Sequence, residues 1–181
     1  MIVEPALRQD LLAAIPSLRA FAISLLHNSN QADDLVQDTI VRAWGAMDRF
    51  ERGTNLNAWL FTILRNLFYS QHRRTKREVQ DPDGSYAAKL RTAPDQQSHL
   101  DFEDLRTALA KLTLDEREAL LLITAEGMSY EEAAAICGTA VGKIKSRVHR
   151  ARTRLTLLLQ RDPADAIGPD GLTRAVLQAR S

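Results

Sequence analysis

The chain has 181 residues, of which 45% are apolar and 26% are charged, a composition typical of a folded protein rather than a disordered one. Leucine and alanine together number 51, whereas valine, isoleucine and the aromatic residues together number 26, so an all-α fold is predicted. No uninterrupted apolar run exceeds five residues, the length of Ala119–Ile123, which is far below the ~20 residues of a membrane span. A single cysteine excludes an internal disulfide framework, and no signal peptide opens the chain. We therefore expect a cytoplasmic protein that does not attach to a membrane.

The net charge of +1 hides two clusters of positive charge. One lies in residues 65–77 and the other in residues 143–154, and neither stretch contains an acid. An acidic stretch, residues 81–104, separates them. Two separate basic clusters predict two contacts with one polyanion such as DNA. The alternative is two helix faces that are simply solvated.

The division of the chain follows from a segment rich in proline, glycine and aspartate, residues 79–98. Such a composition is typical of a flexible linker. We predict an N-terminal helical domain over residues 1–78, a C-terminal helical domain over residues 99–161, and a tail over residues 162–181.

In the N-terminal domain, apolar residues recur at helical spacing from Leu7 to Leu25, with Pro16 expected to kink the helix or restart it. A second periodic segment over residues 36–47 includes Trp44 in its apolar stripe. Residues 50–57 contain a glycine and two asparagines and predict a loop.

A third apolar stripe, residues 56–67, runs into the first basic cluster and interleaves aromatic and cationic side chains. This pattern suits single-stranded or melted DNA, because bases stack on aromatic rings and the backbone follows positive charge. Trp59 and Phe61 are interpreted as core residues. The candidate DNA contacts in this part of the chain are Thr54, Asn55, Asn57, Arg65, Asn66, Tyr69, Arg73 and Arg74.

The C-terminal domain begins with an apolar stripe over residues 105–112. Two capping-box patterns then open further periodic segments: Thr113 with Glu116, and Ser129 with Glu132. A turn at residues 137–139 leads into a long helix over residues 141–155. A short capped helix, a tight turn and a longer helix form the helix-turn-helix layout.

The long helix has one apolar and one basic face, and no acid lies between Lys143 and Arg161. Such a helix fits the major groove of B-form DNA, where arginine and lysine meet guanine edges and phosphates. The alternative is a helical hairpin with a solvated basic face. The candidate contacts with duplex DNA are Lys143, Lys145, Ser146, Arg147, Arg150 and Arg154.

Asp34 and Asp38 lie one helical turn apart, away from the stripe that contains Val36 and Ile40. No histidine or nucleophile accompanies them, so an acidic face for a basic partner protein is the simpler interpretation. The four histidines lack metal-ligand spacing and no glycine-rich phosphate loop occurs. We expect no enzymatic activity, no metal and no cofactor.

Three segments together resemble bacterial sigma factors of the extracytoplasmic-function (ECF) group: DLVQDTIVRAW, AWLFTILRNL and IKSRVHRARTRL, in this order. The resemblance extends from about Leu7 to Leu159. Within the group, FERGTNLNAWLFTILRN and MSYEEAAAICGTAVGKIKSRV are most similar to the EcfG type, which drives the general stress response in alphaproteobacteria.

The resemblance implies a role for each domain. The N-terminal domain would be sigma region 2, which melts the minus-10 element of the promoter, and the C-terminal domain would be sigma region 4, which reads the minus-35 element as duplex. It also implies an anti-sigma factor of the NepR type as a partner. The residues facing core RNA polymerase would be Asp34, Gln37, Asp38 and Arg42.

Two other functions stay open at this point. PhyR-type regulators carry a sigma-like domain that serves only as a decoy for the anti-sigma factor. They also carry a receiver domain, which we do not expect in this chain. An ordinary helix-turn-helix regulator is the second alternative, although it leaves the N-terminal domain unexplained.

Overall fold

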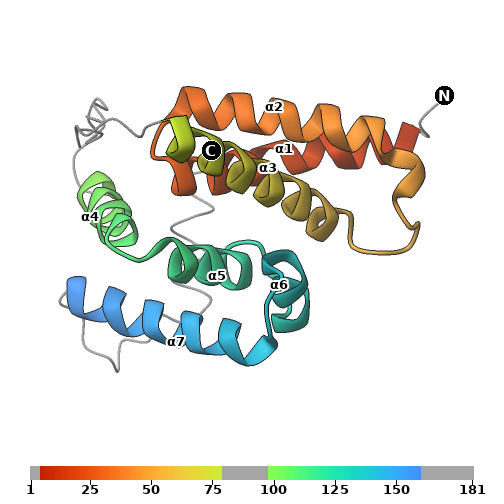
Figure 1. Ribbon diagram of the computed structural model, residues 1–181. Helices are drawn as coiled ribbons and strands as arrows, with labels where there is room; N and C mark the ends of the chain where they lie inside the picture. The colour runs from red at the N-terminus through yellow and green to blue at the C-terminus, as the bar shows by residue number, and fades with distance from the viewer. Residues whose placement is uncertain (1–4, 79–97, 160–181) are drawn as a thin grey trace. The chain divides into compact units, whose positions relative to one another are not determined.

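The computed structural model describes residues 5–78 and 98–159, and all regular structure in these two ranges is helical. The predicted all-α class is therefore confirmed. The chain divides into two units, residues 1–90 and 91–181, which Figure 1 colours from red to yellow-green and from green to blue. The predicted linker, apart from Ser98, and the predicted tail lie outside the described residues.

The described residues of the N-terminal unit form three long helices and one turn of 3-10 helix (Figure 1). They are α1 (Pro5–Leu26), α2 (Ser29–Gly45), η1 (Met47–Arg49) and α3 (Leu56–Glu78). Each long helix packs against the other two. Buried side chains from all three form one core, in which the rings of Phe21 and Phe61 meet edge to face at 5.1 Å between centroids. Phe61 is thus a core residue, as predicted.

Helix α1 continues through Pro16 as one helix, so the helix does not restart there. Proline removes one helix hydrogen bond, the one that the carbonyl of Leu12 would accept. The Leu12 side chain is 56% exposed, so this carbonyl lies on the side of the helix that water reaches. On the opposite side, Leu11 and Leu18 are buried in the core, and this packing holds the two halves of the helix in line.

The stretch Ala6–Leu26 of α1 is long and apolar enough to cross a membrane by length and composition alone. A core helix of a soluble protein meets the same criterion. Here Phe21, Ala22 and Leu25 are buried in a helix that packs against α2 and α3, so the domain core accounts for its apolar character.

The C-terminal unit consists of α4 (Ser98–Ala110), α5 (Leu114–Thr124), α6 (Tyr130–Cys137) and α7 (Val141–Leu158). Helix α7 packs against the other three. It contributes Ile144, Val148, Ala151 and Leu155 to the core, each buried and spaced by three or four residues. This is the apolar face that the periodicity predicts.

Both predicted capping boxes are present. The hydroxyl of Thr113 accepts from the amide of Glu116, whose carboxylate accepts from the amide of Thr113. Ser129 and Glu132 make the same reciprocal pair at the start of α6. Because each pair satisfies two amides that a helix start leaves without partners, the sequence pattern determines where α5 and α6 begin.

The turn between α6 and α7 depends on Gly138, which has φ +60 and ψ +42. This left-handed conformation suits glycine because it lacks Cβ. Its amide donates to the carbonyls of Ala134 and Ala135 and closes α6. Two residues later Ala140 is already the N-cap of α7, so α6, the turn and α7 form a helix-turn-helix.

Arg117 connects α5 to the end of α4. Its guanidinium donates to the carbonyls of Leu109 (2.8 Å), Ala110 (3.1 Å) and Leu112 (3.0 Å). The last carbonyls of a helix have no partners within the helix, and this side chain supplies them. Burial lowers the pKa of Arg117 from its ordinary value, yet the guanidinium stays charged at neutral pH.

Replacing Arg117 by Met should destabilise the C-terminal domain by about 3 kcal/mol, because buried carbonyls lose charged donors. Hydrogen–deuterium exchange of the α5 amides measures this free energy of opening within the full chain. Arg106 is the control, because its ion pair with Glu103 is partly exposed to water. Its replacement by Met should cost under about 0.5 kcal/mol, and equal effects of the two changes would contradict the role of Arg117.

Candidate functional site

The outer face of α2 carries the four residues predicted to bind core polymerase. Asp34, Gln37, Asp38 and Arg42 are all exposed, and their spacing of one, three and four residues places them on one side of the helix. Opposite them, Leu35, Val36 and Thr39 are buried against the domain core. The carboxylate of Asp38 accepts from the side-chain amide of Gln71 on α3 at 3.3 Å.

Two large apolar side chains extend this face. Val41 is 66% exposed and Trp44 is 44% exposed. The prediction that Trp44 belongs to the apolar stripe of the helix is wrong, and the exposure of Val41 was not predicted. Exposed apolar groups bordered by charge are typical of a protein-binding surface.

The loop before α3 is shorter than predicted, because α3 already begins at Leu56. Gly53 has φ +88, and the hydroxyl of Thr54 donates to the carbonyl of Glu51 at 2.6 Å. The side chain of Asn55 accepts from the amide of Ala58 at 3.1 Å, as an N-cap of α3 does. Asn57 is exposed in the first turn of α3. Of the two asparagines, Asn55 therefore caps the start of α3.

Aromatic and cationic side chains alternate along α3 as the sequence indicates. The guanidinium carbon of Arg65 lies 4.4 Å from the centroid of the Tyr69 ring. Asn66, Arg73 and Arg74 are exposed along the same helix. Trp59, predicted to lie in the core, is half-buried and packs against Phe50 at 5.1 Å between ring centroids. Helix α3 thus presents rings and positive charge together.

Helix α7 exposes Lys143, Lys145 and Ser146 near its N-terminus. The ammonium group of Lys145 lies 5.7 Å from the centroid of the Tyr130 ring on α6. His149, which the sequence analysis did not select, is exposed one turn beyond Lys145. Spacings of three and four residues place these side chains on neighbouring positions of the helix surface.

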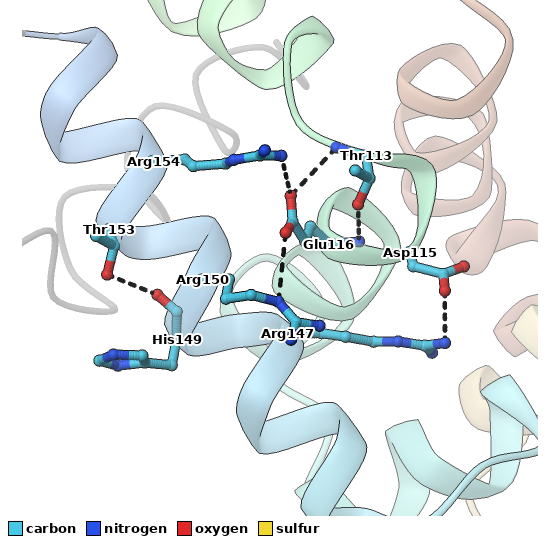
Figure 2. A network of polar contacts seen from close by, with 8 residues as sticks. All are labelled: Thr113, Asp115, Glu116, Arg147, His149, Arg150, Thr153 and Arg154. Atoms are coloured by element: carbon cyan, nitrogen blue, oxygen red, sulfur yellow. Dashed lines mark hydrogen bonds and ion pairs between the residues drawn. The ribbon is translucent and has the colours of Figure 1, made fainter.

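Three of the four arginines of the predicted reading helix lie differently, because each pairs with an acid at the start of α5 (Figure 2). Arg147 donates to Asp115 at 2.6 Å, and Arg154 donates to Glu116 at 2.9 Å. Arg150 lies 3.5 Å from the other carboxylate oxygen of Glu116. This pairing could not be predicted from local sequence patterns, because the hydrogen-bonded partners lie 32 and 38 residues apart in the chain.

The carboxylate of Glu116 is the centre of this network, which we call the α5–α7 network: Asp115, Glu116, Arg147, Arg150 and Arg154. The Glu116 side chain is only 7% exposed and also accepts from the amide of Thr113 at 3.2 Å. Burial would raise its pKa, but the hydrogen bond from the Thr113 backbone and the contact with Arg154 outweigh burial, and the pKa is lowered from 4.5.

Comparison with known proteins identifies both domains. The N-terminal domain matches the family model for sigma-70 region 2 over residues 12–78, and the C-terminal domain matches sigma-70 region 4 over residues 102–155. The chain is 59% identical to the ECF RNA polymerase sigma factor EcfG of Rhodopseudomonas palustris, and the alignment covers 98% of both chains. The chain belongs to the ECF sigma factors.

Solved structures agree with this assignment. The sigma factor RpoE of Bartonella quintana, solved in complex with the anti-sigma factor NepR, is 55% identical, with a TM-score of 0.80 over 88% of this chain and 99% of that one. The PhyRSL chain solved with NepR from Sphingomonas sp. Fr1 is 25% identical, with a TM-score of 0.60 over 82% of this chain and 86% of that one. The ECF sigma factor is thus of the EcfG type, the general stress response type, and is not an enzyme.

The lowered pKa of Glu116 predicts a pH dependence of stability. A carboxylate with a lowered pKa in the folded state stabilises the fold above its unfolded pKa, and this contribution is lost as the pH falls through the folded value. The C-terminal domain should therefore lose stability below pH 4.5, and Glu116→Gln should reduce that loss.

The measurement is hydrogen–deuterium exchange or thermal unfolding of the full chain between about pH 6 and pH 3. Glu131→Gln is the matched control, because Glu131 is exposed in the first turn of α6. This control should follow the wild type. An identical pH profile for Glu116→Gln and wild type would refute the assignment.

Proposed function

We propose that this sigma factor directs core RNA polymerase to promoters through three surfaces: the α2 face, the α3 helix with its preceding loop, and the exposed side of α7. The proposal rests on one observation above all. The residues that the ECF resemblance assigns to polymerase binding are all exposed on one face of α2. Because RNA polymerase acts in the cytoplasm, we place the protein there.

The surface of α2 suits a protein partner. It combines the acids Asp34 and Asp38 with the exposed apolar side chains of Val41 and Trp44. Apolar groups supply affinity on desolvation, whereas the acids favour a basic partner and exclude an acidic one. We assign core RNA polymerase to this face.

The surfaces of α3 and α7 suit two forms of DNA. Arg65 and Tyr69 on α3 form a cation–π pair on which an unpaired base can stack, as the minus-10 element requires once it melts. The residues proposed to act there are Thr54, Asn55, Asn57, Arg65, Asn66, Tyr69, Arg73 and Arg74. Helix α7 is the second helix of a helix-turn-helix, which enters the major groove of a duplex, and we assign it to the minus-35 element.

We also propose that an anti-sigma factor of the NepR type binds this chain, since RpoE of Bartonella quintana was solved with NepR. The decoy function of PhyR-type proteins has less support. The chain is 59% identical to EcfG over nearly its whole length, compared with 25% for PhyRSL.

Run-off transcription with core polymerase and a stress-gene promoter tests the proposal. Wild type should initiate at a defined start. Asp34→Lys with Asp38→Lys should abolish initiation by weakening binding to core polymerase, because both changes reverse charge on the α2 face.

The control variant carries Asp10→Lys and Asp48→Lys, which change the net charge equally at exposed positions on α1 and η1. It should bind core polymerase as wild type does. Wild type that fails to initiate transcription would favour the decoy. Unchanged core affinity of the α2 variant would remove that face from the proposal.

Asn57→Ala should leave closed promoter complexes intact and reduce promoter opening, measured as permanganate reactivity of unpaired thymines. Asn57 is exposed at the start of α3, so its loss should not destabilise the domain. Asn55→Ala removes the cap of α3 and should cost about 1 kcal/mol of stability. Normal opening by the Asn57 variant would move the melting role to other residues.

A further inference from the structure

We propose that Asp115 and Glu116 are positioning residues for promoter recognition: by holding the arginines of α7 they weaken binding to non-promoter duplex more than binding to the minus-35 element. This inference rests on the proposed DNA-reading function of α7. It assigns a role in DNA discrimination to two acids of α5 that lie outside the helix-turn-helix.

Five of the six cations of α7 fall into two groups. Arg147, Arg150 and Arg154 pair with α5 acids, whereas Lys143 and Lys145 pair with no acid within residues 103–159. The sixth cation, Arg152, has a buried Nε with no hydrogen-bond partner among the described residues. Figure 2 shows the three arginines reaching from successive turns of α7 toward Asp115 and Glu116. Only part of the positive charge that the sequence places on α7 is therefore available to any passing phosphate.

Asp115 borders a hollow that cations of α7 line. Together with five residues of α7 it lines a hollow of about 430 Å³, whose other members are Gly142, Lys143, Ser146, Arg147 and Arg150. Nη1 of Arg147 is buried and has no hydrogen-bond partner among the described residues. A phosphate that enters this hollow meets two or three cations but also the charge of Asp115, which repels it.

Glu116 holds its arginines more firmly than an exposed acid could. Its side chain is 7% exposed, so the ion pairs are screened less by water and salt than surface pairs are. Its carboxylate is also fixed by the amide of Thr113. Arg150 and Arg154 remain half-exposed or more, so each can reach DNA while still in contact with the carboxylate.

The two kinds of duplex differ in the contacts that can offset the free energy of breaking the ion pairs between α7 and α5. Binding to non-promoter duplex depends almost wholly on phosphate contacts and counterion release. On such a duplex no base contact offsets the free energy of breaking the ion pairs between the α7 arginines and the α5 acids. At the minus-35 element, base contacts add roughly 1–3 kcal/mol each and favour a fixed orientation of the arginines. The acids therefore widen the difference between the two affinities.

The test uses the full-length chain with Asp115→Asn, Glu116→Gln and both together. Glutamine can still accept at the capping box, so the second change removes charge while keeping the helix start. Fluorescence anisotropy measures binding to two duplexes of equal length across a range of salt. One duplex carries the minus-35 element mapped from a run-off transcription start, and the other carries its scrambled sequence.

The expected result is tighter binding of the variants to scrambled duplex, with a steeper salt dependence. If two further phosphates are neutralised, the slope of log K against log salt becomes more negative by about 1.8. Between about 50 and 200 mM salt this amounts to roughly tenfold, and the ratio of promoter to scrambled affinity should fall. Glu131→Gln removes one acid from the neighbouring α6 and should leave slope and ratio unchanged.

Two results would overturn the proposal. One is an unchanged slope and ratio in the double variant. The other is weaker binding to both duplexes together with faster amide exchange in α5, which indicates a purely structural role. Failure of the wild type to initiate transcription would count against the proposed function instead, and the scrambled-duplex measurement would still decide the role of the acids.

Discussion

The arrangement of helices in the C-terminal domain depends on the first turn of α5. Two consecutive residues of opposite charge there make polar contacts with two different parts of the domain. Glu116 receives guanidinium groups from α7, and Arg117 donates to the carbonyls at the end of α4. Both side chains are largely buried, so removing one partner leaves a charge or a carbonyl in a poorly solvated place. Apolar packing brings α4, α5 and α7 together, and these polar contacts determine the orientation of α7.

The helix starts of this domain could be predicted from the sequence because their causes are local. Thr113 with Glu116 and Ser129 with Glu132 lie three residues apart, and each pair closes a capping box. The buried face of α7 was equally predictable from its spacing. Three features could not be predicted in this way: the continuity of the helix at Pro16, the exposure of Trp44, and the pairing of the α7 arginines. The pairing depends on acids that another helix supplies, so the local pattern of α7 could not show it.

The same pairing shows why counting cations overstates the charge that DNA meets. The sequence places six cations between residues 143 and 154 without an acid, and the acids that balance three of them come from another helix. Salt dependence reports phosphates neutralised on binding, rather than cations present in a sequence segment. The positive charge that a basic cluster offers to DNA can therefore be judged only when the acids that lie beside it in the fold are known.

The two basic clusters of this sigma factor consequently suit different tasks. On α3, Arg65 lies over the ring of Tyr69, so positive charge and an aromatic surface are held together, as stacking of unpaired bases requires. On α7, three of the four arginines pair with carboxylates, and our proposal is that charge alone then binds duplex DNA weakly and base contacts supply the rest. Melted DNA exposes bases of any sequence, whereas duplex DNA must be distinguished among many similar sites. Pairing the arginines with acids is useful for distinguishing duplex sites, and this pairing is found in the domain that we assign to duplex DNA.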